Sequence, residues 1–175
     1  LFGGSRWTVE SARAMESFAA AHDLPLVAAF RFHDIIDNHC PAYVGDAGVA
    51  MNGYMKDLLR EADLILALNI RFGEATTDGY SLFDAPKMKA DLIHSHASDD
   101  EIGKIYTPDL PVHAGPNAMA SALAAMALPD SAARSDWCRA ARQKYIDSLV
   151  APEQSGDVDM GAITAHIQET LPENA

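Results

Sequence analysis

The segment Asp63–Asn69, with the sequence DLILALN, decides the fold class of this chain. It is a short apolar run without alternation of apolar and polar side chains, which is typical of a strand covered on both faces. Three further runs have the same character: Leu24–Phe30 (LPLVAAF), Asp91–Ala97 (DLIHSHA) and Leu110–Gly115 (LPVHAG). Leu1 and Phe2 indicate the last residues of another strand, cut at its beginning. The sequence therefore predicts about five to six buried strands.

Segments with helical periodicity separate these strands. Residues 7–23 place an apolar stripe on one helical face, which consists of Val9, Ala12, Met15 and Ala19. Residues 50–63 do the same with Met51, Met55, Leu58 and Leu59, and residues 117–128 are strong helix formers. Alternating strands and helices predict an α/β domain, a Rossmann-like doubly wound parallel sheet with helices on both faces.

The alternation stops at Pro129. An amphipathic helix is predicted for residues 131–150, a polar linker follows, and residues 160–171 predict a last helix. We expect residues 1–128 to form one domain and residues 129–175 to be a helical C-terminal tail. Both ends of the chain suggest a piece of a longer polypeptide.

Composition narrows the function classes. A net charge of −12 and a pI near 4.8 argue against nucleic acid or an anionic membrane as partner. No apolar run reaches the roughly 20 residues that cross a bilayer. The cysteines Cys40 and Cys138 are too few and too far apart for a disulfide framework, which favours the cytoplasm.

The turn after the first strand is the first candidate site. Gly3, Gly4 and Ser5 stand where a Rossmann-like domain binds a phosphate at a helix N-terminus. A tight turn in which Ser5 only caps the helix is at least as well supported, because no G-x-G-x-x-G fingerprint is present. Arg71 follows the strand at 63–69 and is placed to meet an anion at the same sheet edge.

The stretch RFHDIIDNHCPAYVGD, residues 31–46, holds a second candidate. Its potential metal ligands are His33, Asp34, Asp37, His39 and Cys40. His33 and His39 are six positions apart, a spacing that suits neither a helix nor a strand, and Pro41, Gly45 and Gly48 favour a loop that caps the sheet. We expect a structural loop and no metal site. A metal-dependent hydrolase that uses His33, Asp34 and His39 is the competing hypothesis.

Several separated motifs agree in order and spacing with one family. They are GGSRW (3–7), AAFRFHDIIDNHCPAYVGDAGV (28–49), EADLILALNIRFGEATTDGYSLF (61–83) and LIHSHASDDEIGKIYTPDLPV (92–112). Together they resemble the central domain of thiamine diphosphate-dependent enzymes, with the acetolactate synthase-like group as the most similar branch. The resemblance covers residues 1–128, and residues 129–175 resemble the connection to the C-terminal coenzyme domain.

The resemblance implies where the chemistry of the parent enzyme lies. Such enzymes bind thiamine diphosphate between an N-terminal domain that supplies a Glu and a C-terminal domain whose Gly-Asp-Gly motif holds Mg²⁺. No Gly-Asp-Gly occurs in this sequence. We therefore expect no catalytic residue and no cofactor here, with thiamine diphosphate and Mg²⁺ bound in the parent. The expected partners are the N- and C-terminal domains of the same polypeptide and further copies in a homo-oligomer.

Acetolactate synthases hold FAD in this domain, and their pattern maps onto cofactor-binding candidates here. Gly3, Gly4 and Ser5 match the glycine turn, Gly45 and Gly48 the second loop, and Arg71 the arginine after the strand at 63–69. The chain departs from the family at three places: the family's Asp-Asp-Arg is Gly-Glu-Ala at 73–75, and acidic residues are replaced by His96 and Gly115. We expect poor FAD binding, and hence a non-catalytic structural domain with a vestigial nucleotide cleft. A free-standing nucleotide-binding module of the same fold is the alternative.

Overall fold

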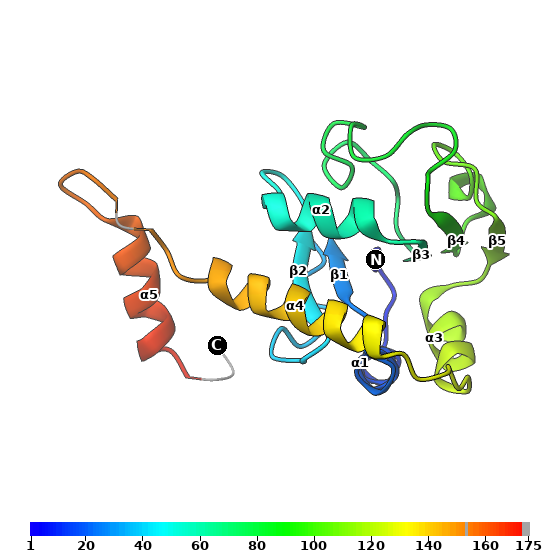
Figure 1. Ribbon diagram of the computed structural model, residues 1–175, viewed down its shortest axis with the longest axis horizontal. Coiled ribbons are helices and arrows are strands. Elements are labelled where there is room, and N and C mark those ends of the chain that lie inside the picture. The colour runs from blue at the N-terminus through cyan, green and yellow to red at the C-terminus, as the bar shows by residue number, and fades with distance from the viewer. Residues whose placement is uncertain (153, 173–175) are drawn as a thin grey trace.

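The computed structural model describes residues 1–152 and 154–172 (Figure 1). The elements in chain order are α1 Val9–Ala21, β1 Leu26–Ala29, β2 Tyr43–Ala47, α2 Gly53–Glu61, β3 Leu64–Leu68, β4 Asp91–His96, the 3₁₀ turn η1 Asp99–Glu101, β5 Leu110–His113, α3 Pro116–Ala124, α4 Ala132–Ser148 and α5 Met160–Thr170. The predicted tail, 129–175, includes residues 153 and 173–175, which lie outside the described residues.

Phe2 joins the strands into one parallel arrangement. β1 pairs with β2, β3 pairs with β4, and β4 pairs with β5, all in parallel. Phe2 forms parallel bridges to Ala28 of β1 and to Leu68 of β3, and its N–H donates to Val27. The order across the sheet is therefore β2, β1, Phe2, β3, β4, β5. This is the order of a Rossmann fold, which reverses between Phe2 and β3.

The structure corrects the sequence-based reading of residues 41–48. We expected a loop there, but Tyr43–Ala47 forms β2, an outer strand of the sheet. Its sequence, YVGDA, contains Gly and Asp, which are depleted in strands. β2 is nevertheless almost wholly buried, because pairing with β1 and packing against helices override the weak local preference.

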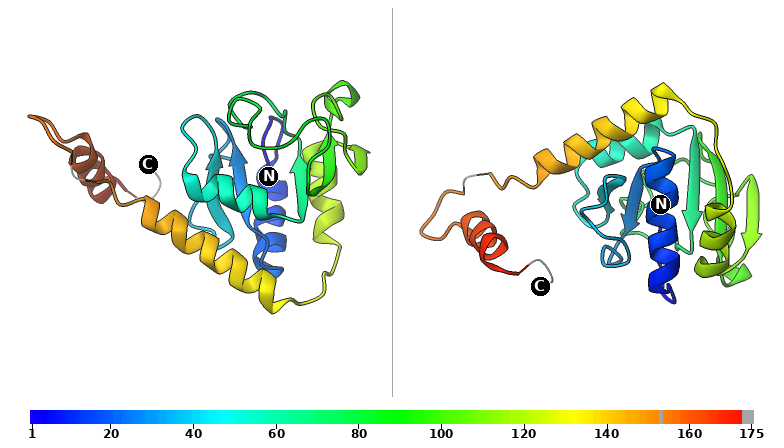
Figure 2. Two further views of the ribbon diagram at one scale, coloured as in Figure 1. Left: turned by 45° about the horizontal axis from the view of Figure 1, so that its top comes forward. Right: turned by 90° about the horizontal axis from the view of Figure 1, so that it is seen from below.

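Helices cover both faces of the sheet (Figure 2). α1 and α3 pack together over one face, where Met15, Phe18 and Leu123 join Phe2 in a buried cluster. α2 lies on the opposite face with Met55, Leu58 and Leu59 in one buried cluster with Val27 and Val44 of β1 and β2. Burial on both faces explains why β1, β3 and β4 are continuous apolar runs. β5 was expected to be buried as well, but it is an outer strand of the sheet without a buried residue. The predicted doubly wound α/β fold is confirmed.

The first helix starts later than the glycine turn suggests. Its N-cap is Thr8, whose hydroxyl accepts from the Ser11 N–H at 3.2 Å, so the expectation that Ser5 caps the helix was wrong. The chain needs three more residues to change direction, and Arg6 has a positive φ of 73° in this segment. Val9, placed on the apolar stripe by periodicity, is exposed, whereas Ala12, Met15 and Ala19 are buried.

α4 packs on the sheet, although it belongs to the segment predicted as a tail. Cys138 and Ala141 are buried, and Arg142 donates to the carbonyls of Asn38 and Tyr43 at 3.0 and 2.6 Å. α5 buries little besides Gly161. In the described part of the chain, no helix combines the length and the hydrophobicity that a membrane crossing requires.

Candidate functional site

A cavity of about 740 Å³ lies where the strand order reverses. It is lined by Gly4, Ser5 and Arg6 after Phe2, by Asn69, Arg71 and residues 73–76 after β3, by His96, Ala97 and Ser98 at the end of β4, and by Ala29, Phe30 and Phe32 at the end of β1. All these residues stand at or beyond the carboxyl ends of parallel strands. Doubly wound domains bind ligands in this crevice, so the cavity is the first candidate site.

Gly4 and Asn69 both line the cavity and lie in close contact. Gly4 has a φ of +69°, and a Cβ at this position would lie 2.2 Å from the Asn69 carbonyl oxygen. The Asn69 side-chain amide donates to the carbonyls of Gly3 at 3.3 Å and Ser5 at 3.0 Å, and the residue is buried. A glycine is therefore required here because two strand ends approach closely.

The cavity carries positive charge, although the chain as a whole is strongly acidic. Arg6 and Arg71 line it, and Glu74 is the only carboxylate among the described residues that do so. Arg71 lies 3.8 Å from Glu101 through its Nε, and its side chain is 75% exposed. Its guanidinium therefore remains available to an anion, for which its planar donor array is suited.

His96, the last residue of β4, lines the cavity. The residue is 9% exposed, and the Ser98 N–H donates to its Nδ1 at 3.0 Å. The Ser98 carbonyl lies 3.1 Å from the same nitrogen. Both contacts involve Nδ1: the Ser98 N–H requires a lone pair there and the Ser98 carbonyl requires a proton, so the two bonds belong to different states of the ring.

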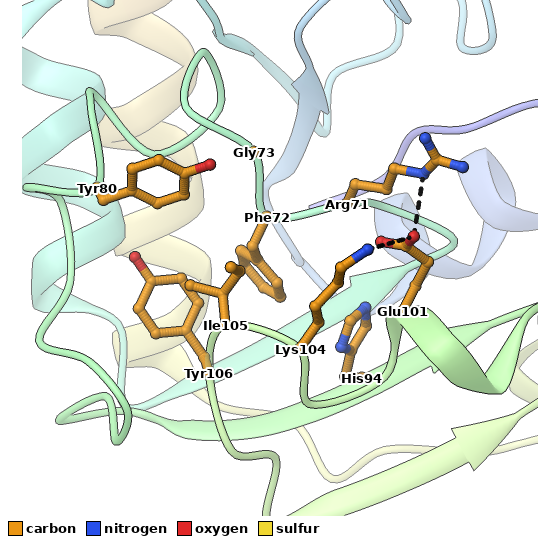
Figure 3. Close-up of a pocket in the computed structure, with 9 residues that line it drawn as sticks. All are labelled: Arg71, Phe72, Gly73, Tyr80, His94, Glu101, Lys104, Ile105 and Tyr106. Carbon is orange, nitrogen blue, oxygen red and sulfur yellow. Dashed lines mark hydrogen bonds and ion pairs between the residues drawn. The ribbon is translucent and has the colours of Figure 1, made fainter.

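A smaller pocket of about 200 Å³ adjoins the cavity and shares Arg71 and Gly73 with it. Figure 3 shows Arg71 and Lys104 directed at the Glu101 carboxylate, which Lys104 reaches at 3.1 Å. This hydrogen bond from Lys104 holds the pKa of Glu101 below its usual value. Arg71, Glu101 and Lys104 thus form an ion-paired cluster in the lining of the smaller pocket.

The base of the smaller pocket is aromatic and buried. His94 is 1% exposed and lies against Phe72, with ring centroids 5.2 Å apart. Its Nε2 is 3.1 Å from the Ile70 carbonyl, which can only accept, so Nε2 carries the proton. Nδ1 has no partner among the described residues, and burial lowers the pKa of this imidazole. His94 is therefore a neutral core histidine at pH 7.

The structure separates the predicted cofactor-binding residues into two groups. Gly4, Ser5 and Arg71 line the cavity, and Gly3 directly precedes them. Gly45 and Gly48 lie outside the lining. Gly45 is inside β2, where a Cβ would lie 2.7 Å from the Tyr54 hydroxyl oxygen, so this glycine makes room for α2.

The expectation that the first helix offers free N–H groups to a phosphate needs correction. α1 begins at Val9, and the cavity is lined only as far as Arg6. The Thr8 N–H donates to Asn117 at 3.0 Å, and the Ser11 N–H donates to Thr8. Side chains of this domain already satisfy these groups, so an anion would rely on Ser5, Arg6 and Arg71.

The segment 31–42 between β1 and β2 forms a loop, as predicted. Asp34 is exposed, and His39 contacts Asp37 through both its backbone N–H and its ring, at 2.8 and 3.0 Å. These bonds hold the pKa of Asp37 below its usual value. In residues 1–152 and 154–172, no three His, Cys, Asp or Glu side chains come together as a metal site.

Asn69 and the orientation of His96 are the features that sequence reasoning missed. The sequence presents Asn69 only as the last residue of a predicted strand. An Asn placed directly after a buried apolar run is the signal that could have identified it, because Asn tolerates positive φ and its φ here is 53°. From the sequence, His96 was noted only because it stands where the family resemblance implies an acidic residue.

Comparison with known proteins agrees with this geometry. Residues 1–123 match the family described as "Thiamine pyrophosphate enzyme, central domain". The mitochondrial acetolactate synthase of Schizosaccharomyces pombe is 28% identical over 100 residues, which cover 54% of this chain and 15% of that protein.

Two relatives carry a different name, 3D-(3,5/4)-trihydroxycyclohexane-1,2-dione hydrolase. The protein from Geobacillus thermodenitrificans is 28% identical over 178 residues, covering 99% of this chain and 26% of its own length. The protein from Clostridium perfringens is 29% identical over 86 residues, which cover 49% of this chain and 13% of that protein. The chain thus spans about a quarter or less of each of these curated relatives. With a family match over residues 1–123 and a Rossmann-like fold around the switch-point cavity, the chain belongs to the central-domain family of thiamine pyrophosphate enzymes.

Proposed function

We propose that this chain serves as the non-catalytic central domain of an acetolactate synthase-like enzyme that cleaves or joins bonds next to a 2-oxo group. The observation that carries the proposal is the switch-point cavity, which offers arginines and a glycine turn but, among the described residues, no constellation for proton or acyl transfer. The domain packs the coenzyme domains of its parent, and α4 and α5 lead toward the C-terminal one.

Thiamine diphosphate and Mg²⁺ do not fit the residues of this chain. Mg²⁺ prefers carboxylate and other oxygen ligands in near-octahedral geometry. Among the described residues, no three His, Cys, Asp or Glu side chains are placed so that they could hold a metal ion, and the sequence has no Gly-Asp-Gly. The coenzyme and its metal would be held by the flanking domains of the parent, which assembles as a homo-oligomer.

FAD also fits the cavity poorly. Its diphosphate would meet Ser5, Arg6 and Arg71, but its ribose would meet His96, where the resemblance to acetolactate synthases implies a carboxylate. Losing a hydrogen bond to a charged group costs roughly 1.5–3 kcal/mol. His96 and Gly115 together would weaken flavin binding about a hundredfold or more, at 1.4 kcal/mol per factor of ten. We propose that the cavity retains a diphosphate site and has lost the flavin.

Calorimetric titration tests both parts of this proposal on the chain. Thiamine diphosphate with Mg²⁺ should give no saturable heat, and FAD should keep its free fluorescence when protein is added. Pyrophosphate should bind, and Arg71→Ala should weaken it about tenfold, whereas Arg139→Ala on the exposed side of α4 should not. Micromolar binding of thiamine diphosphate, or a yellow preparation with stoichiometric flavin, would contradict the proposal.

A further inference from the structure

We propose that Asn52 is a site of spontaneous deamidation, which converts the residue at the start of α2 into aspartate or isoaspartate. Among the asparagines of the sequence, only Asn52 precedes a glycine. The structure leaves both members of this Asn-Gly pair accessible, as the following contacts show. The modification concerns the chemistry of the backbone and is independent of what the switch-point cavity binds.

The reaction joins the Asn52 side chain to the next backbone nitrogen. The Gly53 nitrogen loses its proton and attacks the side-chain carbonyl carbon of Asn52, and a succinimide ring forms as ammonia leaves. Water then opens the ring at either of its two carbonyl carbons, which gives aspartate or isoaspartate. The net change consumes water, releases ammonia and creates a carboxylate, so no oxidant, metal or second enzyme takes part.

The Asn52 side chain is free to react. Asn52 is exposed and is the N-cap of α2, but its side chain makes no capping hydrogen bond. An N-cap side chain usually accepts a hydrogen bond from an N–H of the first helical turn. Such a bond would hold the side-chain carbonyl away from the Gly53 nitrogen, and here it is not formed.

Gly53 leaves the approach to this carbonyl open. The residue is exposed, and a Cβ built on it would meet no atom within 4 Å. It is the first residue of α2, so its N–H has no partner inside the helix. Glycine also rotates about its backbone bonds more freely than any other residue. The attacking nitrogen is therefore neither shielded nor held.

The helix slows the reaction without blocking it. Asn52 has a ψ of 146°, and rotation about this bond has to bring the Gly53 nitrogen toward the side chain. The rotation breaks the hydrogen bonds that the Asn52 carbonyl accepts from the N–H groups of Met55 at 3.0 Å and Lys56 at 3.2 Å. Opening of one helix end is a local event. We expect the folded chain to deamidate about tenfold or more slowly than the chain unfolded in urea.

Asn117 is a matched control within the same chain. It lies in the first turn of α3, and Ala118 follows it. Its side-chain oxygen accepts from the Thr8 N–H at 3.0 Å, and its side-chain nitrogen donates to the Arg6 carbonyl at 3.0 Å. Both ends of this amide are thus held, and the next residue carries a Cβ. Asn117 should stay intact while Asn52 is converted.

Incubation of the purified chain at neutral to mildly alkaline pH, followed by peptide mass spectrometry, tests the inference. We expect acid to accumulate at Asn52 and not at Asn117, with isoaspartate among the products. The rate should rise with pH, because the Gly53 nitrogen must lose its proton. Gly53→Ala should slow the conversion several-fold, and the open space around Gly53 lets this variant keep its fold.

Three results would overturn the inference. The first is an Asn52 that stays intact in the folded chain while the urea-unfolded chain deamidates. The second is equal conversion of Asn52 and Asn117. The third is an unchanged rate in Gly53→Ala or a product without isoaspartate, since either would exclude the succinimide route. Asn52→Asp provides the standard that identifies the aspartate product.

Discussion

The Asn69 side-chain amide donates to the backbone carbonyl of Ser5 at 3.0 Å and thereby ties the end of β3 to the turn after the first strand. It also reaches the Gly3 carbonyl at 3.3 Å. These bonds lie at the floor of the cavity, across the point where the strand order reverses. They occupy the carbonyls of the turn, so the donors of Arg6 and Arg71 dominate what the cavity offers a ligand.

Replacing Asn69 should destabilise the domain. Asn69→Ala removes both bonds and leaves an Ala at a φ of 53°, so we expect a loss of about 2–4 kcal/mol in the free energy of unfolding. Asn69→Gly removes the same bonds without the backbone strain and should lose less. Urea denaturation measures both, and an Asn69→Ala variant as stable as the unsubstituted chain would refute the role of this side chain.

Gly4 and Gly73 both line the cavity, and substituting each by Ala gives a matched comparison. Gly4→Ala places a Cβ 2.2 Å from the Asn69 backbone oxygen at a φ of +69°, so we expect a loss of about 2 kcal/mol or more. A Cβ at Gly73 would meet no atom within 4 Å, and Gly73→Ala should stay within about 0.5 kcal/mol. Thermal unfolding of the two variants compares them, and equal losses would contradict the close approach at Gly4.

The buried His94 should make stability depend on pH. Burial lowers its pKa in the folded chain, so between the folded value and about 6.5 the unfolded chain binds more protons. Stability should therefore rise with pH through this window and be lost as pH falls below about 6.5, by at most about 1.4 kcal/mol per pH unit.

The variant His94→Gln isolates this contribution. Its amide N–H can still donate to Ile70, but the side chain does not titrate, so the slope of unfolding free energy across the window just below the ordinary histidine pKa should be smaller. Urea titrations at several pH values give the slope. An identical slope in the variant and the unsubstituted chain would show that His94 does not contribute.

Arg142 and Arg139 test how α4 is attached. Arg142 donates to two backbone carbonyls and lies over the Tyr145 ring at 5.0 Å, so Arg142→Ala should cost about 1.5–3 kcal/mol. Arg139 pairs with Asp136, and both side chains are more than 70% exposed, so Arg139→Ala should cost less than about 1 kcal/mol. If the two variants unfold at the same denaturant concentration, α4 is not anchored through Arg142.

The sequence predicted the elements whose preference is local. Continuous apolar runs identified β1, β3, β4 and β5 within a few residues. Helical periodicity identified α1, α2 and α4, and helix-forming composition identified α3. β2 was not predicted as a strand because its Gly and Asp are typical of a loop. It is a strand because it pairs with β1, which is a contact in space. Phe2 presents a similar case, since a single residue bridges two strands distant in sequence.

The site shows the same division. Strand alternation was enough to predict the fold class, and the resemblance of the separated motifs was enough to predict the family. Gly4, Ser5 and Arg71 were predicted as site residues from their place at the carboxyl ends of strands. Tertiary structure alone decided that Asn69 bonds to the carbonyls of the turn, that Gly45 packs against Tyr54, and that the Ser98 N–H donates to Nδ1 of His96. The physical reason is that local preference acts between neighbours in the chain, whereas these contacts arise only when the parallel sheet places residues 3–5, 69 and 96 along one edge.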